Sequence, residues 1–155
     1  MSTRPRPFVT SPHLIGLLIV TARLAQEQVA IRLSALGISY AQAVVLVRLY
    51  RSASGTLPQS DMIESLAVSR ASGTLVLSQL EARGLVSRAA DPGDARRLVI
   101  ELTGTGRELE EPVHAVFEEV ESVIRRSLGP ADVTAAFDIL RRMFDDVRHH
   151  RRTRT

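Results

Sequence analysis

The hydrophobic pattern changes its period in the second half of the chain, and this change limits the folds that the sequence can adopt. Residues 85–90 and 97–102 alternate between apolar and polar side chains, and Asp, Pro and Gly lie between them. This pattern predicts two strands joined by a loop at 91–96. The segments on both sides repeat apolar residues every three or four positions, which is typical of helices. We therefore expect a mainly α fold with one small β-hairpin.

Helix-start signals divide the part before the hairpin into four helices. Ser11-Pro12 combines a capping residue with a proline at the first helical position. Ser39–Gln42 and Thr56–Gln59 both have the spacing of a capping box, and Ser69 is a further N-cap. Glycines supply left-handed stops after the first and the fourth helix. The helices are predicted at 11–36, 40–51, 57–66 and 70–83.

The part after the hairpin predicts two long helices. Thr103 restarts a helix, in which apolar residues recur at three- and four-residue spacing from Leu109 to Ile124. Pro112 lies inside this helix and should kink it. Gly129-Pro130 breaks the chain before a last helix, whose apolar face runs from Val133 to Val147.

Composition narrows the class of protein. The 155 residues fit one domain, and only 4% of them are aromatic, which predicts an aliphatic core. The apolar run Leu14–Val20 is shorter than the roughly 20 residues of a membrane span, so we expect a cytoplasmic protein. The absence of cysteine excludes disulfides, thiolate metal sites and cysteine redox sensing.

Charge is distributed unevenly along the chain. Residues 1–60 carry six Arg against one Glu, a net +5, whereas residues 108–146 carry ten acids against four Arg, a net −6. Residues 147–155 return four Arg. A polyanion would be attracted to some faces of this molecule and repelled from others. All 20 basic residues are arginine, which binds phosphate and guanine through a planar fork of donors.

The helix predicted at 70–83 has an unusual outward face. At 100° per residue, Gly73, Val76, Leu77 and Leu80 share one face, which should pack on the preceding helices. The small and nearly uncharged residues of the opposite face are Ala71, Leu75, Ser78 and Ala82. A helix with such a face can enter the major groove of DNA. We expect close packing against the short helix before it to explain a glycine at position 73.

Ordered sequence segments resemble signatures of the MarR family. They are residues 68–74 (VSRASGT), 80–86 (LEARGLV), 91–97 (DPGDARR) and 102–106 (LTGTG). Gly37-Ile38-Ser39 with Gln42 is similar to the entry of the family's second helix, and the likeness covers roughly residues 13–147. The resemblance implies a winged helix-turn-helix fold in a homodimeric DNA-binding regulator. At Leu75 the sequence departs from the family, which usually has a basic or polar residue there.

The resemblance and the helix geometry together give a set of candidate DNA contacts. These are Ser69, Arg70, Ala71, Ser72, Thr74, Leu75, Arg88, Asp94, Arg96 and Arg97. We expect Leu75 and Ala71 to contact thymine methyl groups, while Arg70 and Ser72 bond to bases or phosphates. The resemblance places Asp94 and Arg96 at the tip of the wing beside the minor groove, with Asp94 bracing Arg96.

Arg88 and Arg97 have two interpretations on sequence grounds. They could hold phosphates of the DNA backbone, in which case affinity falls steeply with salt. They could equally be solvated charges on the strands.

The family resemblance also implies a domain organisation. It comprises a flexible arm at 1–10, dimerisation helices at 11–36 and 104–148, the winged domain at 37–103 and a basic tail at 149–155. Related proteins bind small aromatic or phenolic acids between the dimer region and the winged domain, and then release DNA. The candidate effector residues are His13, Arg23, Tyr40 and Arg48. Tyr40 could instead be a packing residue.

Several other interpretations of the sequence compete with that of a dimeric DNA-binding regulator. The terminal helices could complete a monomer core, and the winged domain could bind protein instead of DNA. Glu110, His114 and Glu118 share a helix face and could in principle bind a metal, although such pairs are commoner as exposed charges. We expect no metal, no cofactor and no enzyme activity, because no nucleophile elbow, phosphate loop or dinucleotide motif is present.

Overall fold

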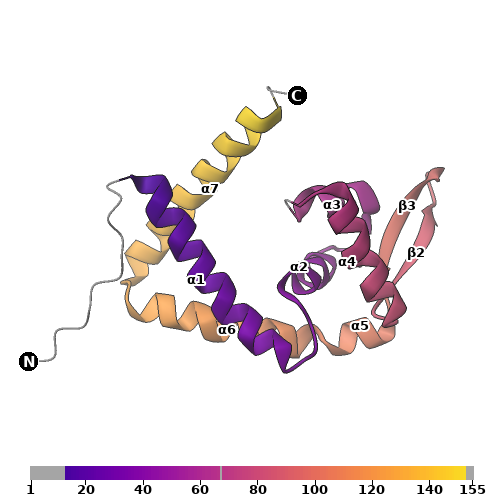
Figure 1. The fold of residues 1–155 in the computed structure, drawn as a ribbon, viewed down its shortest axis with the longest axis horizontal. Helices are drawn as coiled ribbons and strands as arrows, with labels where there is room; N and C mark the ends of the chain where they lie inside the picture. Colours follow the sequence, from indigo (N-terminus) through magenta and orange to yellow (C-terminus); the bar gives the residue numbers. More distant parts are fainter. Residues whose placement is uncertain (1–12, 67, 153–155) are drawn as a thin grey trace, which may run out of the picture. The chain divides into compact units, whose positions relative to one another are not determined.

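The computed structural model describes residues 13–66 and 68–152. They form two compact units, the first ending at Phe117 and the second starting at Glu118. The elements in chain order are α1 (Leu14–Ser34), α2 (Tyr40–Tyr50), β1 (Thr56–Pro58), α3 (Gln59–Ser65), α4 (Arg70–Ala82), β2 (Val86–Asp91), β3 (Asp94–Leu102), α5 (Gly104–Glu108), α6 (Glu110–Arg126) and α7 (Pro130–Arg152). The predicted fold class, mainly α with a small β wing, is confirmed (Figure 1).

The first unit is built around α4. This helix packs against α2, α3 and β2, while α2 and α3 also contact β3. Its core is aliphatic, as the composition predicts. The side chains with no exposed surface include Leu46, Leu49, Met62, Leu77, Leu80 and Ile100. They come from α2, α3, α4 and β3, so that α4 and the hairpin share one core.

Both predicted glycine stops are confirmed. Gly37 and Gly84 have φ angles of 66° and 67°, the left-handed conformation that glycine adopts without strain. Each is followed by a closing bond, from the Ile38 N–H to the Leu33 carbonyl and from the Leu85 N–H to the Leu80 carbonyl. This arrangement satisfies carbonyl groups that a helix end would otherwise leave unpaired.

One of the two predicted capping boxes is present in the structure and the other is not. At the start of α2, Ser39 accepts from the Gln42 N–H and the Gln42 side chain accepts from the Ser39 N–H, at 3.2 and 3.0 Å. The box predicted at Thr56–Gln59 is wrong. Thr56–Pro58 forms β1, paired antiparallel with β3, and α3 begins after Pro58 without a side-chain cap. The Thr56 hydroxyl is bonded to Ser54 instead, and the backbone gains strand partners in place of a cap.

The helix after the hairpin is interrupted before the proline that should kink it. Thr103 caps α5 by accepting from the Gly106 N–H, as predicted. The helix then breaks at Leu109, and Pro112 lies in the first turn of α6, where its missing N–H has no intrahelical acceptor to lose. A proline signal therefore marks the start of a new helix here, not a bend within one.

The chain termini differ partly from expectation. The predicted arm at 1–10 and the helix start at Ser11-Pro12 lie outside the described residues. The basic tail predicted at 149–155 is wrong for residues 149–152, because α7 continues through Arg152. No glycine or proline follows Pro130, so nothing in the sequence stops the helix earlier.

Helix α1 leaves most of its apolar residues exposed. Only Val29 and Leu33, near its end, are buried. The exposed apolar side chains are Leu14, Ile15, Leu17, Ile19, Val20, Leu24 and Ile31. Among the described residues it is the one helix that is long and apolar enough to cross a membrane, judged by length and composition alone. The run Leu14–Val20, on which the sequence-based expectation relied, therefore underestimates the length of this apolar segment.

A close backbone contact holds α5 against the end of α4. A Cβ atom on Gly106 would lie 2.1 Å from the Leu85 carbonyl oxygen, which leaves no space for any side chain. The Tyr50 hydroxyl donates to the Gly106 carbonyl at 2.8 Å, and the Thr103 hydroxyl donates to the Gly84 carbonyl at 2.7 Å. Burial, aided by the charge of Glu110, raises the pKa of Tyr50 to about 12.

We predict that Tyr50→Phe lowers the free energy of unfolding by about 1 kcal/mol at pH 7, because the Gly106 carbonyl loses its donor. The raised pKa adds a pH dependence. The neutral phenol is favoured in the folded state, so its contribution is complete below pH 10 and is lost as the pH rises from 10 to 12. Urea unfolding at pH 7, 9 and 11 measures both effects. A variant that loses as much stability as the wild type between pH 9 and 11 would contradict the second one.

Candidate nucleic-acid interface

The start of α4 is fixed by its cap. The Ser69 hydroxyl accepts from the Ser72 N–H at 3.1 Å and lies 2.8 Å from the Ser72 hydroxyl. Arg70, in the first turn, is exposed, and no bond joins its guanidinium to another part of the described chain. The Thr74 hydroxyl donates to the Arg70 carbonyl, so its lone pairs stay available as acceptors. The N-terminal end of α4 therefore offers polar groups in a fixed geometry.

The two predicted faces of α4 are present in the structure. Gly73, Leu77 and Leu80 are buried, and Val76 is half-buried. On the opposite side, Ala71 and Ala82 are exposed and Ser78 is half-buried. Leu75 lies at the centre of the outer face with 59% of its surface exposed. Leu75 is therefore an apolar side chain that is available for contact at the centre of this face.

Gly73 lies where α4 crosses α3. A Cβ atom at this position would be 2.8 Å from Cγ2 of Ile63 and within 3.3 Å of two further carbons of the same side chain. These atoms are close to the backbone of Ile63 and cannot swing aside as the end of a long side chain could. The expectation that position 73 requires glycine for packing on the short helix is confirmed.

The hairpin is longer and its turn is tighter than the sequence predicts. The loop predicted at 91–96 shrinks to Pro92-Gly93, because residues 94–96 belong to β3. Asp91 pairs with Asp94, whereas Ala90 pairs with Leu98, so residues 95–97 bulge from the ladder. The alternation of side chains stops at this bulge. That is why the sequence pattern marked β3 only from residue 97.

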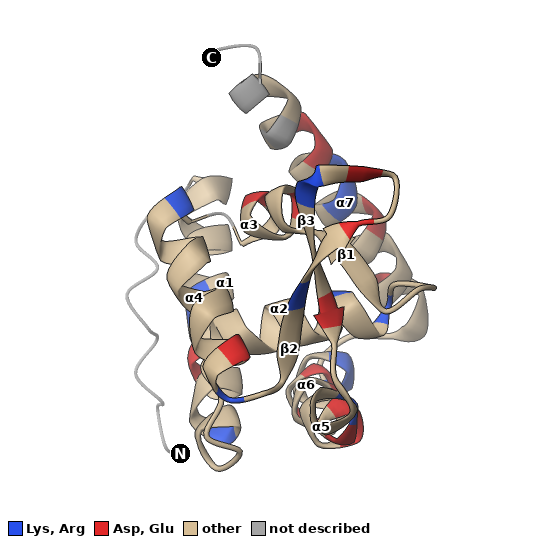
Figure 2. Cartoon of the chain, turned by 90° about the vertical axis from the view of Figure 1, so that its right-hand side faces the viewer, with Lys and Arg blue, Asp and Glu red and all other residues tan. Residues whose placement is uncertain are grey.

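Acidic side chains organise the tip of the hairpin through backbone bonds. Asp91 accepts from the Gly93 N–H at 2.8 Å, and Asp94 accepts from the Arg96 N–H at 3.0 Å. The Asp94 side chain therefore braces Arg96, as expected, but it does so by holding the backbone N–H of Arg96 and not its guanidinium. Arg96 and Arg97 are exposed, and neither guanidinium is bonded to another part of the described chain. Figure 2 shows basic residues on α4 and on the hairpin.

Arg88 is placed differently from the other candidate DNA contacts. Its guanidinium donates to Glu81 at 2.7 Å and to the Ser78 hydroxyl at 3.0 Å, both on α4. Neither of the two interpretations drawn from the sequence includes this ion pair. Sequence analysis missed Glu81, and it placed Ser78 on the outward face of the helix without this contact. The only signal available was their three-residue spacing on α4, which puts them on one side of the helix.

Two further bonds join α4 and its C-cap residue to α2 and to the turn before it. The Arg83 guanidinium donates to the Gly37 carbonyl at 2.6 Å, and the Gln42 side chain donates to Gln79 at 3.3 Å. Gln42 is buried and serves both this bond and the cap of α2. Neither contact could be predicted from the sequence pattern, because both join residues more than 35 positions apart.

The structure does not bring the predicted effector residues into one site. His13 is the N-cap residue of α1 and Arg23 lies on the helix; both are exposed, and the ten positions from one to the other span about 15 Å. Arg48 is exposed on α2. Tyr40 is half-buried, with its ring centroid 6.4 Å from that of Phe117, so it has the packing role that was its alternative.

A hollow in the first unit lies elsewhere, on α5 and the start of α6. Its lining is Arg107, Glu108, Glu110, Glu111, His114 and Ala115. None of the predicted effector residues belongs to it. Among the described residues, no three His, Cys, Asp or Glu side chains are grouped closely enough to hold a metal ion.

The sequence of this chain is similar to a known protein family and to curated regulators. Residues 38–98 match the model of the MarR family. The chain is 31% identical over 91 residues to the transcriptional repressor NicR of Pseudomonas putida, a match covering 59% of the chain and 58% of NicR. The curated relatives are matched over less than two thirds of their own length.

Solved structures share the fold over nearly their whole length. BpsR of Bordetella bronchiseptica, whose DNA binding is regulated by 6-hydroxynicotinic acid, has a TM-score of 0.77 and 26% identity, covering 90% of this chain and 99% of that one. MepR of S. aureus in its DNA complex has a TM-score of 0.77 and 24% identity, covering 88% and 99%. The similarity to MepR shows that the two chains share one fold.

We predict that Gly73→Ala destabilises the protein despite the better helix propensity of alanine. Alanine gains up to about 1 kcal/mol in a helix, whereas overpacking a filled site costs about 1–3 kcal/mol. Gly104→Ala is the matched control, because a Cβ atom there meets nothing within 4 Å. Chemical denaturation should show a loss for Gly73→Ala and no loss for Gly104→Ala. Equal stability of the two variants would refute the close contact with Ile63.

Proposed function

The chain belongs to the MarR family, and we propose that it acts as a homodimeric transcriptional regulator that binds duplex DNA through α4 and the β2–β3 hairpin. The observation that carries this proposal is the outer face of α4, where the uncharged residues Ala71, Leu75 and Ala82 are exposed. A major groove about 12 Å wide admits a helix of this kind. We infer a regulator and not an enzyme, because the exposed groups of this face are suited to contact and not to proton transfer.

The proposed base contacts lie along α4. Leu75 and Ala71 would pack on thymine methyl groups, while Arg70, Ser72 and Thr74 bond to base edges or phosphates. The cap residue Ser69 lies at the same end. The exposed position of Leu75 supports its role, since an apolar contact in the groove would remove it from water.

The proposed backbone contacts come from the hairpin. Arg96 and Arg97 are exposed on the bulge, and Asp94 holds the main chain of that bulge. Arginine is favoured beside a narrow minor groove, where the negative potential is enhanced. We propose that Arg96 inserts there and that Arg97 holds a phosphate.

We propose that a second copy of the chain covers the exposed apolar helices. One helix-turn-helix reads few base pairs, and two-fold partners place their recognition helices roughly 34–36 Å apart. On α6, α7 and the turn between them, the exposed large apolar residues are Val123, Ile124, Leu128, Phe137, Ile139, Leu140, Phe144 and Val147. Such a surface on α6 and α7 is typical of a helical dimerisation region.

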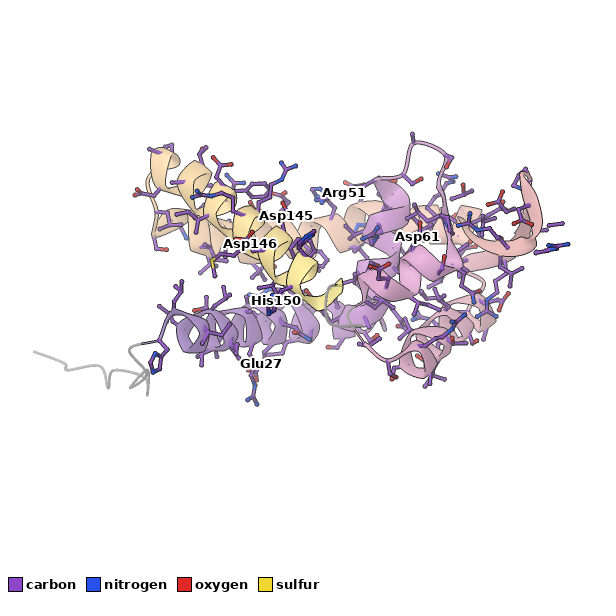
Figure 3. All side chains as sticks on the ribbon, turned by 90° about the horizontal axis from the view of Figure 1, so that it is seen from above. Glu27, Arg51, Asp61, Asp145, Asp146 and His150 are labelled. Carbon is purple, nitrogen blue, oxygen red and sulfur yellow. The ribbon has the colours of Figure 1, made fainter. Side chains whose placement is uncertain are left out.

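A dimer interface also explains the exposed apolar surface of α1 better than a membrane does. Arg23 and Glu27 lie close to the middle of this 21-residue helix, and Figure 3 shows Glu27 extending outward from it. A charge at the centre of a membrane helix costs about 2.5–3.5 kcal/mol. At a dimer interface the same side chains can reach water. We therefore propose a cytoplasmic protein.

We further propose repression of a near-palindromic operator, released by a small aromatic or phenolic acid. The support is the likeness to NicR, a repressor, and to BpsR, which responds to a hydroxylated aromatic acid. The residues predicted for the effector do not form one site in the described chain, so we propose the class of ligand and not its contacts. Thermal-shift screening of hydroxylated benzoic and nicotinic acids tests this part separately.

Selection of duplexes from a random pool tests the central proposal. We expect the wild-type protein to enrich a two-fold symmetric sequence and to lose affinity steeply with salt. Removing one phosphate contact per subunit with Arg97→Gln should lower the slope of log Kd against log [NaCl] by about 1.8 for the dimer. Failure to enrich any sequence, with no salt-dependent binding, would sink the proposal in favour of a protein-binding winged domain.

We predict that Leu75→Ala reduces discrimination at the base pair that it contacts by about 1 kcal/mol, within the range of a single mismatch. The cause is the loss of contact with a thymine methyl group. Binding competition between the selected duplex and its single-base variants measures this effect. Leu98→Ala removes a leucine of similar exposure from the hairpin and should leave the discrimination unchanged. Identical preferences in wild type and Leu75→Ala would remove Leu75 from the interface.

We predict that Phe144→Asp converts the dimer into monomers. Phe144 is 63% exposed on α7, and a carboxylate there could not be buried against a second copy. Arg142→Asp adds an acid on the opposite side of the same helix and serves as the control. Analytical ultracentrifugation should show monomers only for Phe144→Asp. A wild-type protein that is already monomeric would contradict the proposed assembly.

A further inference from the structure

One arginine of the hairpin is directed toward the protein and not toward solvent. Arg88 lies on β2 opposite Ile100 of β3, a residue with no exposed surface. Side chains alternate along a strand, so Arg88 shares its face with the buried Val86. It extends from the core side of the sheet toward α4. The exposed fraction of its side chain is 24%.

The donors of Arg88 are largely used within the first unit. Two different nitrogens of its guanidinium bond to Glu81 and to Ser78, and the Nε atom is buried without a partner in the described part of the chain. A phosphate held in the bidentate way would need two neighbouring donors pointing to solvent. By contrast, Arg96 and Arg97 are exposed and have no such bonds within the described residues.

We propose that Arg88 is a positioning residue that fixes the angle of the hairpin against α4, so that the wing and the recognition helix meet DNA as one rigid body. The inference rests on the proposed DNA binding and assigns Arg88 a different task from Arg97. Glu81 is its charged partner and Ser78 its second anchor, three residues apart on α4. The pair is partly buried and hydrogen-bonded, with 24% of the Arg88 side chain and 39% of the Glu81 side chain exposed, and it joins β2 to α4 at one defined position.

Opposite substitutions at the ion pair separate this role from a phosphate contact. Arg88→Gln should weaken binding of the selected duplex by about two- to thirtyfold with an unchanged salt slope, whereas Arg97→Gln lowers the slope. Glu81→Gln should also weaken binding, although it removes a negative charge near DNA. A direct electrostatic effect would strengthen it instead. A reduced slope for Arg88→Gln, or tighter binding by Glu81→Gln, would overturn the proposal.

Hydrogen exchange in the absence of DNA tests the same inference independently of function. Glu81→Gln should speed amide exchange in β2 and in the adjoining part of β3 while leaving α2 unchanged, and Glu111→Gln, an exposed substitution on α6, should alter neither. Unchanged exchange in the hairpin of Glu81→Gln would overturn the positioning role even if the protein binds DNA. If no duplex is bound at all, the proposed function fails, and this measurement still decides whether Arg88 holds the hairpin.

Discussion

The first unit depends on the burial of the inner face of α4. Leu77 and Leu80 have no exposed surface, and Gly73 brings the helix so close to α3 that no larger residue fits. Because this face supplies the packing of α4, the exposed outer residues Ala71, Leu75 and Ala82 are not needed for the core of the first unit. These positions can carry residues whose role is contact with a partner, and the exposed Leu75 at the centre of the outer face is one of them.

The parts of this architecture that depend on local signals could be predicted from the sequence. The cap of α2, the cap at Ser69 and the left-handed glycines each follow from the chemistry of a few neighbouring residues. The two faces of α4 follow from its periodicity. These features are reliable because their cause lies within one turn of the chain.

The features that were mispredicted or missed depend on residues distant in sequence. Thr56–Pro58 has the spacing of a capping box, but β3 supplies strand partners that outweigh it. The bulge at 95–97 hides the true length of β3 from a test for alternation. The ion pair between Arg88 and Glu81 forms only because β2 folds back beside α4. The proposed DNA contacts of the wing therefore needed the structure to separate Arg88 from Arg96 and Arg97.

The bonds that join the end of α4 to the entry of α2 have a consequence for the spacing of two such helices. Arg83, the C-cap of α4, reaches Gly37 in the turn after α1, and Gln79, one turn earlier, reaches Gln42 in the first turn of α2. Rotation of α4 about its own axis would break both bonds, whereas a tilt shared with the turn would keep them. In a two-fold pair, a tilt of this kind changes the distance between the recognition helices without unfolding either one. Duplex DNA repeats every 10–10.5 base pairs, so a small change of tilt would suffice to move both helices out of step with successive major grooves.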